Sequence, residues 1–409
     1  MKILYLTFYF EPDLSPGSFR NTSLVNELSL QLPEGSQIRV ITTQPNRYKS
    51  YKPSAPEHED RRSNGCRVTI DRINIPSHKG GQFDQIRSFW TYFWAALRLT
   101  KSQEYDLIFA SSSRLFTAFL GAVLARRERS LLVLDIRDLF REGILEVHKN
   151  PLIHLILNPV LRLVENITFR SANHINLVSE GFRSYFSPYT QATYSYYTNG
   201  IDDMFLDFTS FFQHRKRTAS VSGQITTILY AGNIGDGQGL HKIIPQAARQ
   251  LGDRYRFVVI GDGSAKLQLE NAIRAENVLN VDLRKPISRA ELIANYQYAD
   301  YLLVHLNDLD VCNRVLPSKL FDYGVTDKPI LAGVAGFAAS FVRTHLNNSL
   351  LFPPGDVTSM IRHLHESPYR TEVRTEFTRR FQRKTISRDM ARQIRKLLDS
   401  RRLQKQLFM

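Results

Sequence analysis

Cysteine is scarce in this sequence, and its scarcity excludes several classes of protein. The 409 residues include two cysteines, Cys66 and Cys312, which lie far apart in the chain. Two distant thiols supply neither the disulfide framework of a small secreted protein nor the closely spaced ligands of a structural zinc site. We therefore expect a protein of a reducing compartment, the cytoplasm.

The chain also lacks long uninterrupted apolar runs. The longest uncharged apolar stretches, residues 115–125 and 151–161, fall well short of the ~20 residues that span a bilayer. The opening residues, MKILYLTFYF, run into acidic residues and proline without the basic region and cleavage site of a secretion signal. We expect no membrane-spanning helix, and we interpret residues 2–8 as a first strand.

Acidic residues are outnumbered by basic ones, and the net charge is +15. Such a charge attracts nucleic acid, a phosphate-bearing small molecule or an anionic membrane surface. No helix-turn-helix, zinc finger or aromatic RNA platform is recognisable, so we expect no nucleic-acid partner. Residues 87–101 predict a helix with four apolar side chains on one side: Trp90, Phe93, Trp94 and Leu97. This pattern fits an interfacial helix on an anionic membrane, and it fits a crossover helix packed on a sheet equally well.

The sequence is rich in short apolar segments, and helical patterns separate them. The first series comprises residues 2–8, 38–43, 106–112, 131–138 and 174–179. The second comprises residues 226–232, 256–263, 278–284, 301–307 and 328–334. Because strands that are apolar on both faces are typical of buried parallel sheets, the pattern predicts two α/β units. The one-sided apolar stripe of residues 240–251 predicts a helix lying on the second sheet.

We place the boundary between the two units near residue 195, with domains at 1–195 and 196–375. The polar and basic segment 214–224 has the composition of a loop or hinge. Residues 376–409 are basic and carry one apolar stripe at helical spacing, formed by Met390, Ile394, Leu397 and Leu398. This stripe predicts a terminal helix that packs back toward the first domain.

Ligands of open α/β sheets bind beyond the carboxyl ends of the strands, so loops after strands are the candidate sites. Gly17 and Arg20 follow the first strand and open a helix; they fit an anion site and a plain strand-to-helix turn equally well. Asp135 and Asp138 follow a later strand, where an acid can hold a sugar hydroxyl or cap the next helix. The convergence of two acids with Arg137 favours function there.

Two glycine-containing loops follow strands of the second unit. The loop YAGNIGDGQGL contains Gly232, Asn233 and Gly235, a composition typical of phosphate cradles, although it lacks the lysine of a P-loop. Gly261 lies in a Gly-Asp-Gly that fits a tight turn, and we give it a supporting role.

The segment VLPSKLFDYG combines residues of a helix start with a lysine and an acid. Pro317 and Ser318 suit the first turn, so the amides from Ser318 to Leu320 would face a bound anion at the positive end of the helix dipole. Lys319 would lie across that anion, and Asp322 would accept hydrogen bonds from a ribose diol. In the alternative interpretation Ser318 only caps the helix, and Lys319 and Asp322 are solvated.

In their order along the chain, these loops resemble those of bacterial family 4 (GT4) glycosyltransferases, which have the GT-B fold of two Rossmann-like domains facing across a cleft. The resemblance is carried by MKILYLTFYFEPDLSPGSFR, VLDIRDLF, LVSEGFRSYF, TNGID, YAGNIGDGQGL, VVIGDGSAKLQLE and VLPSKLFDYGVTDKPILAGVAGFA. The Pro-Ser-Lys before the helix is similar to the branch that assembles O-antigen, capsule or exopolysaccharide.

The resemblance implies a retaining, metal-independent transfer of sugar from a nucleotide diphosphate sugar, with UDP as the expected nucleotide, to a lipid-linked or glycan acceptor. It implies no cofactor. We expect a cytoplasmic location, and the charge and the aromatic helix leave peripheral attachment to the inner face of the cell membrane open. We assign catalysis to Asp138, Lys319 and Arg20. We assign donor binding to Gly17, Gly232, Asn233, Gly235, Gly261, Pro317, Ser318, Lys319, Leu320 and Asp322.

The chain departs from the family pattern at several positions. The family carries two glutamates eight residues apart; here the second is Asp322 and the first is Arg314, which cannot accept a hydrogen bond. The glycine loop offers Asn233 and Asp236 where the family has an arginine and a lysine, and Asp138 occupies the loop comparable to that of a family histidine. A catalytically weakened scaffold and a nucleotide-sugar epimerase of the same fold therefore stay open.

The sequence Asp308-Leu309-Asp310 has the form of a manganese motif of the other glycosyltransferase fold. No further ligands are near it in the sequence, so we interpret it as a solvated loop and predict no essential metal ion. The donor sugar, the acceptor and the linkage are not determined by the sequence.

Overall fold

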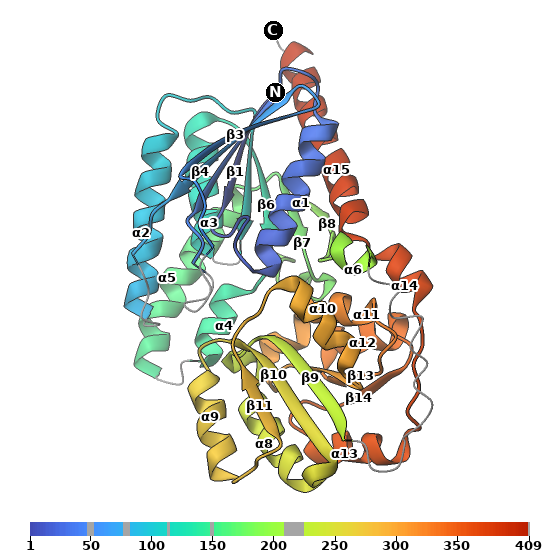
Figure 1. The fold of residues 1–409 in the computed structure, drawn as a ribbon. Helices are drawn as coiled ribbons and strands as arrows, with labels where there is room; N and C mark the ends of the chain where they lie inside the picture. Colours follow the sequence, from blue (N-terminus) through green and yellow to red (C-terminus); the bar gives the residue numbers. More distant parts are fainter. Residues whose placement is uncertain (47–52, 77–81, 113–114, 148–150, 208–224, 408–409) are drawn as a thin grey trace. The chain divides into compact units, whose positions relative to one another are not determined.

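The chain is described by a computed structural model over residues 1–46, 53–76, 82–112, 115–147, 151–207 and 225–407 (Figure 1). It divides into two compact units. The first unit consists of Met1–Asn199 and Arg383–Met409, and the second of Gly200–Gln382. The predicted loop or hinge at 214–224 lies outside the described residues.

The first unit is built on an eight-stranded sheet with the order β3-β4-β2-β1-β5-β6-β7-β8. Every neighbouring pair is parallel except β3 and β4, which form an antiparallel hairpin. The strands are β1 (Lys2–Thr7), β2 (Gln37–Thr43), β3 (His58–Ser63), β4 (Cys66–Ile73), β5 (Leu107–Ser112), β6 (Leu131–Ile136), β7 (His174–Leu177) and β8 (Thr193–Ser195).

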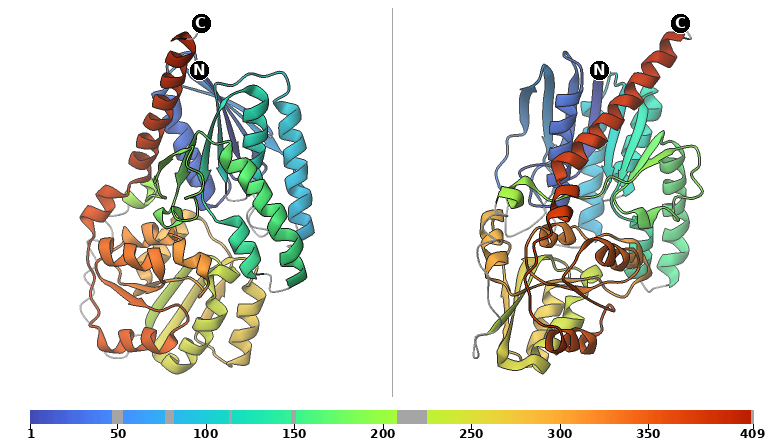
Figure 2. Two further views of the ribbon diagram at one scale, coloured as in Figure 1. Left: turned by 180° about the vertical axis from the view of Figure 1, so that it is seen from behind. Right: turned by 90° about the vertical axis from the view of Figure 1, so that its right-hand side faces the viewer.

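Helices cover both faces of this sheet, as expected for a parallel sheet with apolar strands. One face is covered by α1 and α15, and the other by α2, α3 and α5 (Figures 1 and 2). The bounds are α1 (Pro16–Gln31), α2 (Gln82–Leu99), α3 (Leu115–Glu128), α4 (Phe140–Val147), α5 (Pro151–Arg170), the short 3-10 turn η1 (Glu180–Phe182) and α15 (Arg383–Leu407).

The terminal helix α15 contributes to the core of the first unit. Met390, Ile394 and Leu398 are buried in one cluster with Ile3 and Tyr5 of β1, and Leu397 packs against the same cluster. Apart from the buried Arg383, the described basic residues of α15 lie on its other sides, so the helix combines a buried stripe with a charged surface. It starts at Arg383, later than residue 376, because residues 375–380 form a separate helix of the second unit.

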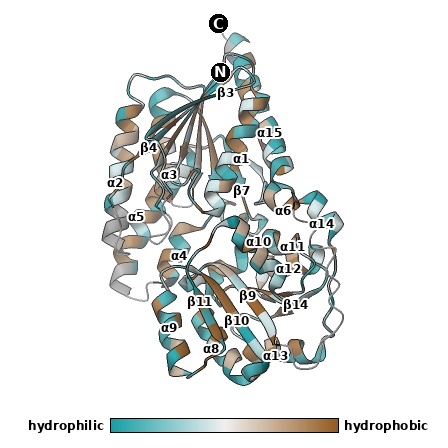
Figure 3. Ribbon diagram, viewed as in Figure 1, coloured by the Kyte–Doolittle hydropathy of each residue, from teal (hydrophilic) through white to brown (hydrophobic). Residues whose placement is uncertain are grey.

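The second unit is built on a six-stranded parallel sheet with the order β11-β10-β9-β12-β13-β14. Its strands are β9 (Thr226–Asn233), β10 (Tyr255–Asp262), β11 (Val281–Arg284), β12 (Tyr301–His305), β13 (Ile330–Gly333) and β14 (Ser349–Phe352). Much of β9 and β10 is hydrophobic (Figure 3). This apolar content agrees with strands covered by helices on both sides.

The helix over residues 240–251 is found with those bounds, as α8 (Leu240–Leu251). Its predicted apolar stripe is buried against the sheet. The other helices of the second unit are α6 (Asp203–Asp207), α9 (Lys266–Ala275), α10 (Arg289–Tyr298), α11 (Lys319–Gly324), α12 (Gly336–His345), α13 (Val357–Glu366) and α14 (Thr375–Arg380). Short 3-10 turns are η2 (Asp236–Gln238), η3 (Gly252–Arg254) and η4 (Asp310–Arg314).

The boundaries between the units fall later than residues 195 and 375. At the second boundary, α14 belongs to the second unit because the ring of Phe377 lies 6.2 Å from that of Phe321 and 6.3 Å from that of Phe341. Phe381, just after α14, adds a fourth ring at 5.5 Å from Phe321. Among the described residues, no helix combines the length and the apolar character needed to span a membrane.

Candidate functional site

Two glycines bring the ends of β9 and β10 into direct contact. Gly232 has a φ of 141°, a region that side-chain-bearing residues rarely adopt. Gly261 lies opposite Gly232 in the parallel register. A Cβ atom on Gly261 would lie 1.9 Å from the Gly232 carbonyl oxygen, so only glycine fits there. The predicted glycine positions therefore shape the carboxyl edge of this sheet.

Lys319, the first residue of α11, reaches across Gly232. A Cβ atom at position 232 would lie 2.6 Å from Lys319 Cε and 2.8 Å from Lys319 Nζ. Lys319 Nζ also lies 4.8 Å from the centre of the Tyr230 ring. The structure thus brings together the lysine and the glycine loop that were predicted to share a ligand, and an aromatic face supports the ammonium group.

The hydroxyl of Tyr323 anchors α11 to β9. The β12 strand pairs with β9 only at Ile228 and Leu229. Two residues further along β9, the N–H of Ala231 donates a hydrogen bond of 3.1 Å to the Tyr323 hydroxyl. Because Tyr323 and Lys319 are four residues apart on α11, this buried contact fixes the helix that carries Lys319.

Gln238 organises the loop that follows Gly232. Its side-chain oxygen accepts hydrogen bonds from the Asn233 amide at 2.9 Å and from the Gly235 N–H at 3.1 Å. Its carbonyl oxygen lies 2.6 Å from Nδ1 of His305. The amide of Asn233 thus helps to hold the loop, in addition to any contact with a ligand.

His305 is a buried neutral base of this loop. Its Nε2 accepts a hydrogen bond of 2.9 Å from the Gly355 N–H, so Nδ1 carries the proton that is donated to the Gln238 carbonyl. Burial lowers the pKa of His305 to about 4. The histidine therefore serves as an uncharged link between the end of β12 and the glycine loop.

The start of α11 differs from the predicted helix start. The helix has 6 residues, and the side chain of Ser318 makes no capping hydrogen bond. The N–H of Leu320 donates to the carbonyl of Pro317 at 3.2 Å. The prediction that the Leu320 amide faces an anion is therefore wrong, because a tight turn already uses this donor. Pro317, Ser318 and Lys319 are half-buried, so Lys319 is not a solvated surface lysine.

Asp322 and Arg314 are both half-buried in the same unit. Asp322 lies in the first turn of α11, and its charge adds to burial in raising the pKa of Tyr296. Arg314 ends η4, in the connection between β12 and α11. The roles predicted for Asp322 and Arg314 in donor binding stay predictions.

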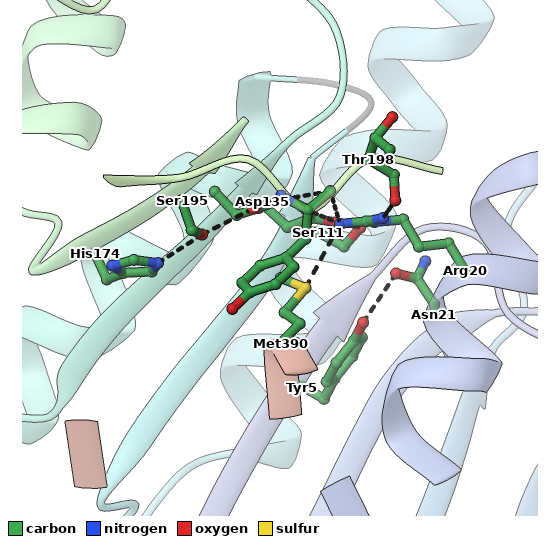
Figure 4. A network of polar contacts seen from close by, with 11 residues as sticks. Tyr5, Arg20, Asn21, Ser111, Asp135, His174, Ser195, Thr198 and Met390 are labelled. Carbon is green, nitrogen blue, oxygen red and sulfur yellow. Dashed lines mark hydrogen bonds and ion pairs between the residues drawn. The ribbon is translucent and has the colours of Figure 1, made fainter. Parts of the chain in front are cut away.

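Arg20 and Asp135 form a buried ion pair in the first unit (Figure 4). The Arg20 guanidinium donates two hydrogen bonds of 2.9 Å to the two carboxylate oxygens, and two more to the carbonyls of Tyr197 at 2.8 Å and Thr198 at 2.6 Å. Asp135 also accepts from Asn176 at 2.7 Å. Although burial raises the pKa of a carboxyl, Arg20 holds the pKa of Asp135 below its usual value.

This network corrects two site assignments. Arg20 was predicted to neutralise phosphate and to act in catalysis, but its donors are taken up by a carboxylate and two carbonyls inside the unit. Asp135 was predicted to hold a sugar hydroxyl or cap a helix, but it is fully buried as the partner of Arg20. The pair instead holds residues 197–198 on the first unit, which explains why the boundary lies beyond residue 195.

Arg137 and Gly17 meet above this pair. A Cβ atom on Gly17 would lie 2.0 Å from Arg137 Nη1, so the glycine makes room for the guanidinium. Arg137 is half-buried, whereas Asp138 is exposed after β6. The convergence of Gly17 with the loop after β6 agrees with the sequence interpretation, and the catalytic role of Asp138 stays a prediction.

Sequence reasoning missed Tyr230 and Tyr323. Tyr230 was recoverable from strand alternation, because residues 230 and 232 point to the same face of β9. Tyr323 was recoverable from helix spacing, since it lies four residues after Lys319.

Across the described part of the chain, no group of three or more His, Cys, Asp or Glu side chains is placed to hold a metal ion. Asp308 and Asp310 are exposed.

No protein-family model matches the chain. In sequence, it is 34% identical over 93 residues to WcaI of Escherichia coli K12, assigned as a colanic acid biosynthesis glycosyl transferase. That match covers 23% of this chain and 23% of WcaI, about a quarter of the length of each.

Solved structures resemble the whole chain. HepE of Anabaena, solved with UDP-glucose, has a TM-score of 0.65 at 14% identity, over 97% of this chain and 100% of HepE. WaaG, a glycosyltransferase involved in lipopolysaccharide biosynthesis, has a TM-score of 0.59 at 12% identity, over 95% of each chain. At these identities the likeness establishes the fold. The chain has the GT-B fold of glycosyltransferases, and the predicted fold class of two Rossmann-like units is confirmed.

Proposed function

We propose that the chain is a glycosyltransferase that takes a sugar from a nucleotide diphosphate sugar, with UDP as the nucleotide, in the synthesis of a bacterial surface polysaccharide. The observation that carries this proposal is the placement of Lys319 across Gly232, at the carboxyl edge of the second sheet. The GT-B fold, the UDP-glucose of HepE and the sequence likeness to WcaI support it.

Lys319 would bind the diphosphate of the donor and stabilise its negative charge as the bond to the sugar breaks. A fixed cation at a half-buried position acts on developing charge more strongly than a mobile surface lysine, because the Tyr323 anchor and the Tyr230 ring orient it in advance. Asp322 would accept hydrogen bonds from the ribose.

The finer features of the reaction are part of the same proposal. We propose that the enzyme retains the anomeric configuration, works without a metal ion, and glycosylates a lipid-linked or glycan acceptor at the cytoplasmic face of the cell membrane. Positive charge from Lys319 supports the metal-independent step. Transfer that is abolished by EDTA and restored by Mn²⁺ would contradict this part.

Arg314 favours a second candidate, a nucleotide-sugar-binding scaffold with weakened catalysis. It occupies the position where the resemblance places a glutamate, and a guanidinium offers no acceptor to the donor sugar. An epimerase of the same fold would interconvert the donor without any acceptor.

One assay separates these functions. Purified full-length chain is incubated with a panel of radiolabelled nucleotide sugars, with and without a lipid extract of bacterial membranes as the acceptor source. We expect label to move to the acceptor fraction for one UDP-sugar. Donor binding without transfer or hydrolysis would favour the scaffold, and donor conversion without acceptor would favour the epimerase.

A further inference from the structure

Helix α5 has an apolar face on each side. Its inward face, with Leu161, Thr168 and Phe169, is buried. Its outward face carries five large apolar side chains that are exposed: Leu155, Ile156, Val160, Leu163 and Ile167. Leu155 and Ile156 are 74% and 71% exposed, respectively. A surface helix ordinarily presents polar residues outward, so this face needs a partner that accepts apolar side chains.

The two tryptophans of the chain lie on the same helical layer. Helices α2, α3 and α5 cover one face of the first sheet (Figure 2). Trp90 and Trp94 of α2 stack on one another at 6.4 Å and are 46% and 56% exposed. Phe93, which the sequence places on the same helical side as the tryptophans, is instead buried, and its ring lies 6.4 Å from that of Phe119 in α3.

The exposed charged side chains of these helices have a single sign, as far as their burial is described. Six exposed arginines belong to the three helices: Arg87, Arg98, Arg126, Arg127, Arg162 and Arg170. Among the residues of α2, α3 and α5 whose burial is described, no acidic side chain is exposed. Glu165 of α5 is buried and accepts from Arg141 at 2.6 Å and from the Tyr185 hydroxyl at 2.6 Å.

We infer that the outer face of α2 and α5 is a docking surface for an anionic membrane. Leucine and isoleucine side chains enter the boundary between headgroups and acyl chains, tryptophan rings prefer the same depth, and arginines attract anionic headgroups. A second protein copy would have to bring an acidic surface to match the exposed arginines of α2 and α5, whereas an anionic leaflet supplies that charge over any area. The inference goes beyond the sugar-transfer reaction and does not depend on it.

The tryptophans provide a direct readout, because the chain contains two and both lie on this face. The purified full-length protein is mixed with vesicles of phosphatidylcholine alone or of phosphatidylcholine with phosphatidylglycerol. We expect its fluorescence to shift to shorter wavelength with the anionic vesicles, and brominated acyl chains to quench it. Vesicle flotation measures the bound fraction in the same samples.

Variants of exposed side chains test the face without disturbing the core. The triple variant I156Q, V160Q and L163Q should lower the vesicle partition coefficient by about tenfold or more, and R162Q with R170Q should remove the preference for anionic lipid. The matched controls are L267Q with L279Q, and R254Q with R274Q, which replace exposed residues of the second unit. Both controls should bind vesicles as the unmodified protein does.

Three results would overturn the inference. The first is an unchanged tryptophan spectrum and no flotation with anionic vesicles. The second is equal vesicle binding by the α5 triple variant and the unmodified protein, at equal melting temperatures. The third is a fluorescence shift without vesicles that grows with protein concentration, which would assign the face to a second copy of this chain.

Discussion

The ammonium group of Lys319 lies 4.8 Å from the centre of the Tyr230 ring, above a glycine loop that leaves room for its side chain. A lysine held in this way has already lost part of its conformational freedom before a ligand arrives. This geometry leads to the first predictions.

Replacing Lys319 should weaken nucleotide binding. A hydrogen bond to a charged group contributes about 1.5–3 kcal/mol, so Lys319→Gln should raise the Kd for UDP by about 10- to 100-fold. Isothermal titration of UDP into both proteins measures the change. Lys285→Gln replaces an exposed lysine of the same unit and should leave the Kd unchanged. Equal UDP affinity for Lys319→Gln and the unmodified protein would show that Lys319 does not bind the nucleotide.

Gly232→Ala should disturb the same site through the backbone. The φ of 141° is unfavourable for alanine, and its Cβ would displace Lys319 Cε, so we expect a loss of about 1–3 kcal/mol in unfolding free energy. The Kd for UDP should rise as well. Gly237→Ala is the matched control in the same loop, because its Cβ would meet no atom within 4 Å. Denaturant titration and calorimetry of both variants test this pair; equal losses from the two substitutions would refute the argument.

Asp135→Asn should destabilise the first unit and spare the nucleotide site. Removing one member of a buried ion pair leaves the charge of Arg20 uncompensated, which costs about 3–5 kcal/mol. The control is Asp282→Asn, which breaks the more exposed pairs with Arg256 and Arg284 and should cost about 1 kcal/mol or less. Urea unfolding gives both values. If Asp135→Asn left stability intact but abolished transfer, the structural role assigned to Asp135 would be wrong.

The buried His305 predicts a dependence of stability on pH. Its folded pKa of about 4 lies below the unfolded value near 6.5, so the unfolded state binds more protons between these values. The stabilisation is complete above about pH 7 and falls as the pH drops toward 4, by about 2 kcal/mol between pH 7 and pH 5. His305→Gln should remove this component of the slope. His365→Gln, at an exposed position, should keep it.

Much of the fold could be predicted because buried strands are recognisable as short apolar runs in the sequence. The ten predicted strands are present, since runs such as Leu107–Ser112 are buried along their whole length. Four strands were missed. β4, with the sequence CRVTIDRI, alternates apolar and polar residues over most of its length and could have been recognised, whereas the other three carry weaker signals. β3, with the sequence HEDRRS, has no apolar residue and alternates between exposed and half-buried positions at the sheet edge. β8 and β14 have 3 and 4 residues, too few to show a period.

The candidate site could be predicted only where neighbouring residues in the sequence determine a residue's place. Gly232 and Lys319 stand at the ends of recognisable elements, so their importance followed from topology. The structural role of Arg20 could not be predicted in this way, because its partner Asp135 is 115 residues away and no local pattern reveals a buried guanidinium. The short turn that consumes the Leu320 amide depends on how α11 packs through Tyr323, which is also a tertiary contact.

The most direct measurement is a crystal structure of the protein with UDP. The account predicts the diphosphate within hydrogen-bond distance, about 3 Å, of Lys319 Nζ and beside Gly232. UDP bound away from both residues, or the absence of UDP from crystals soaked at saturating concentration, would contradict it.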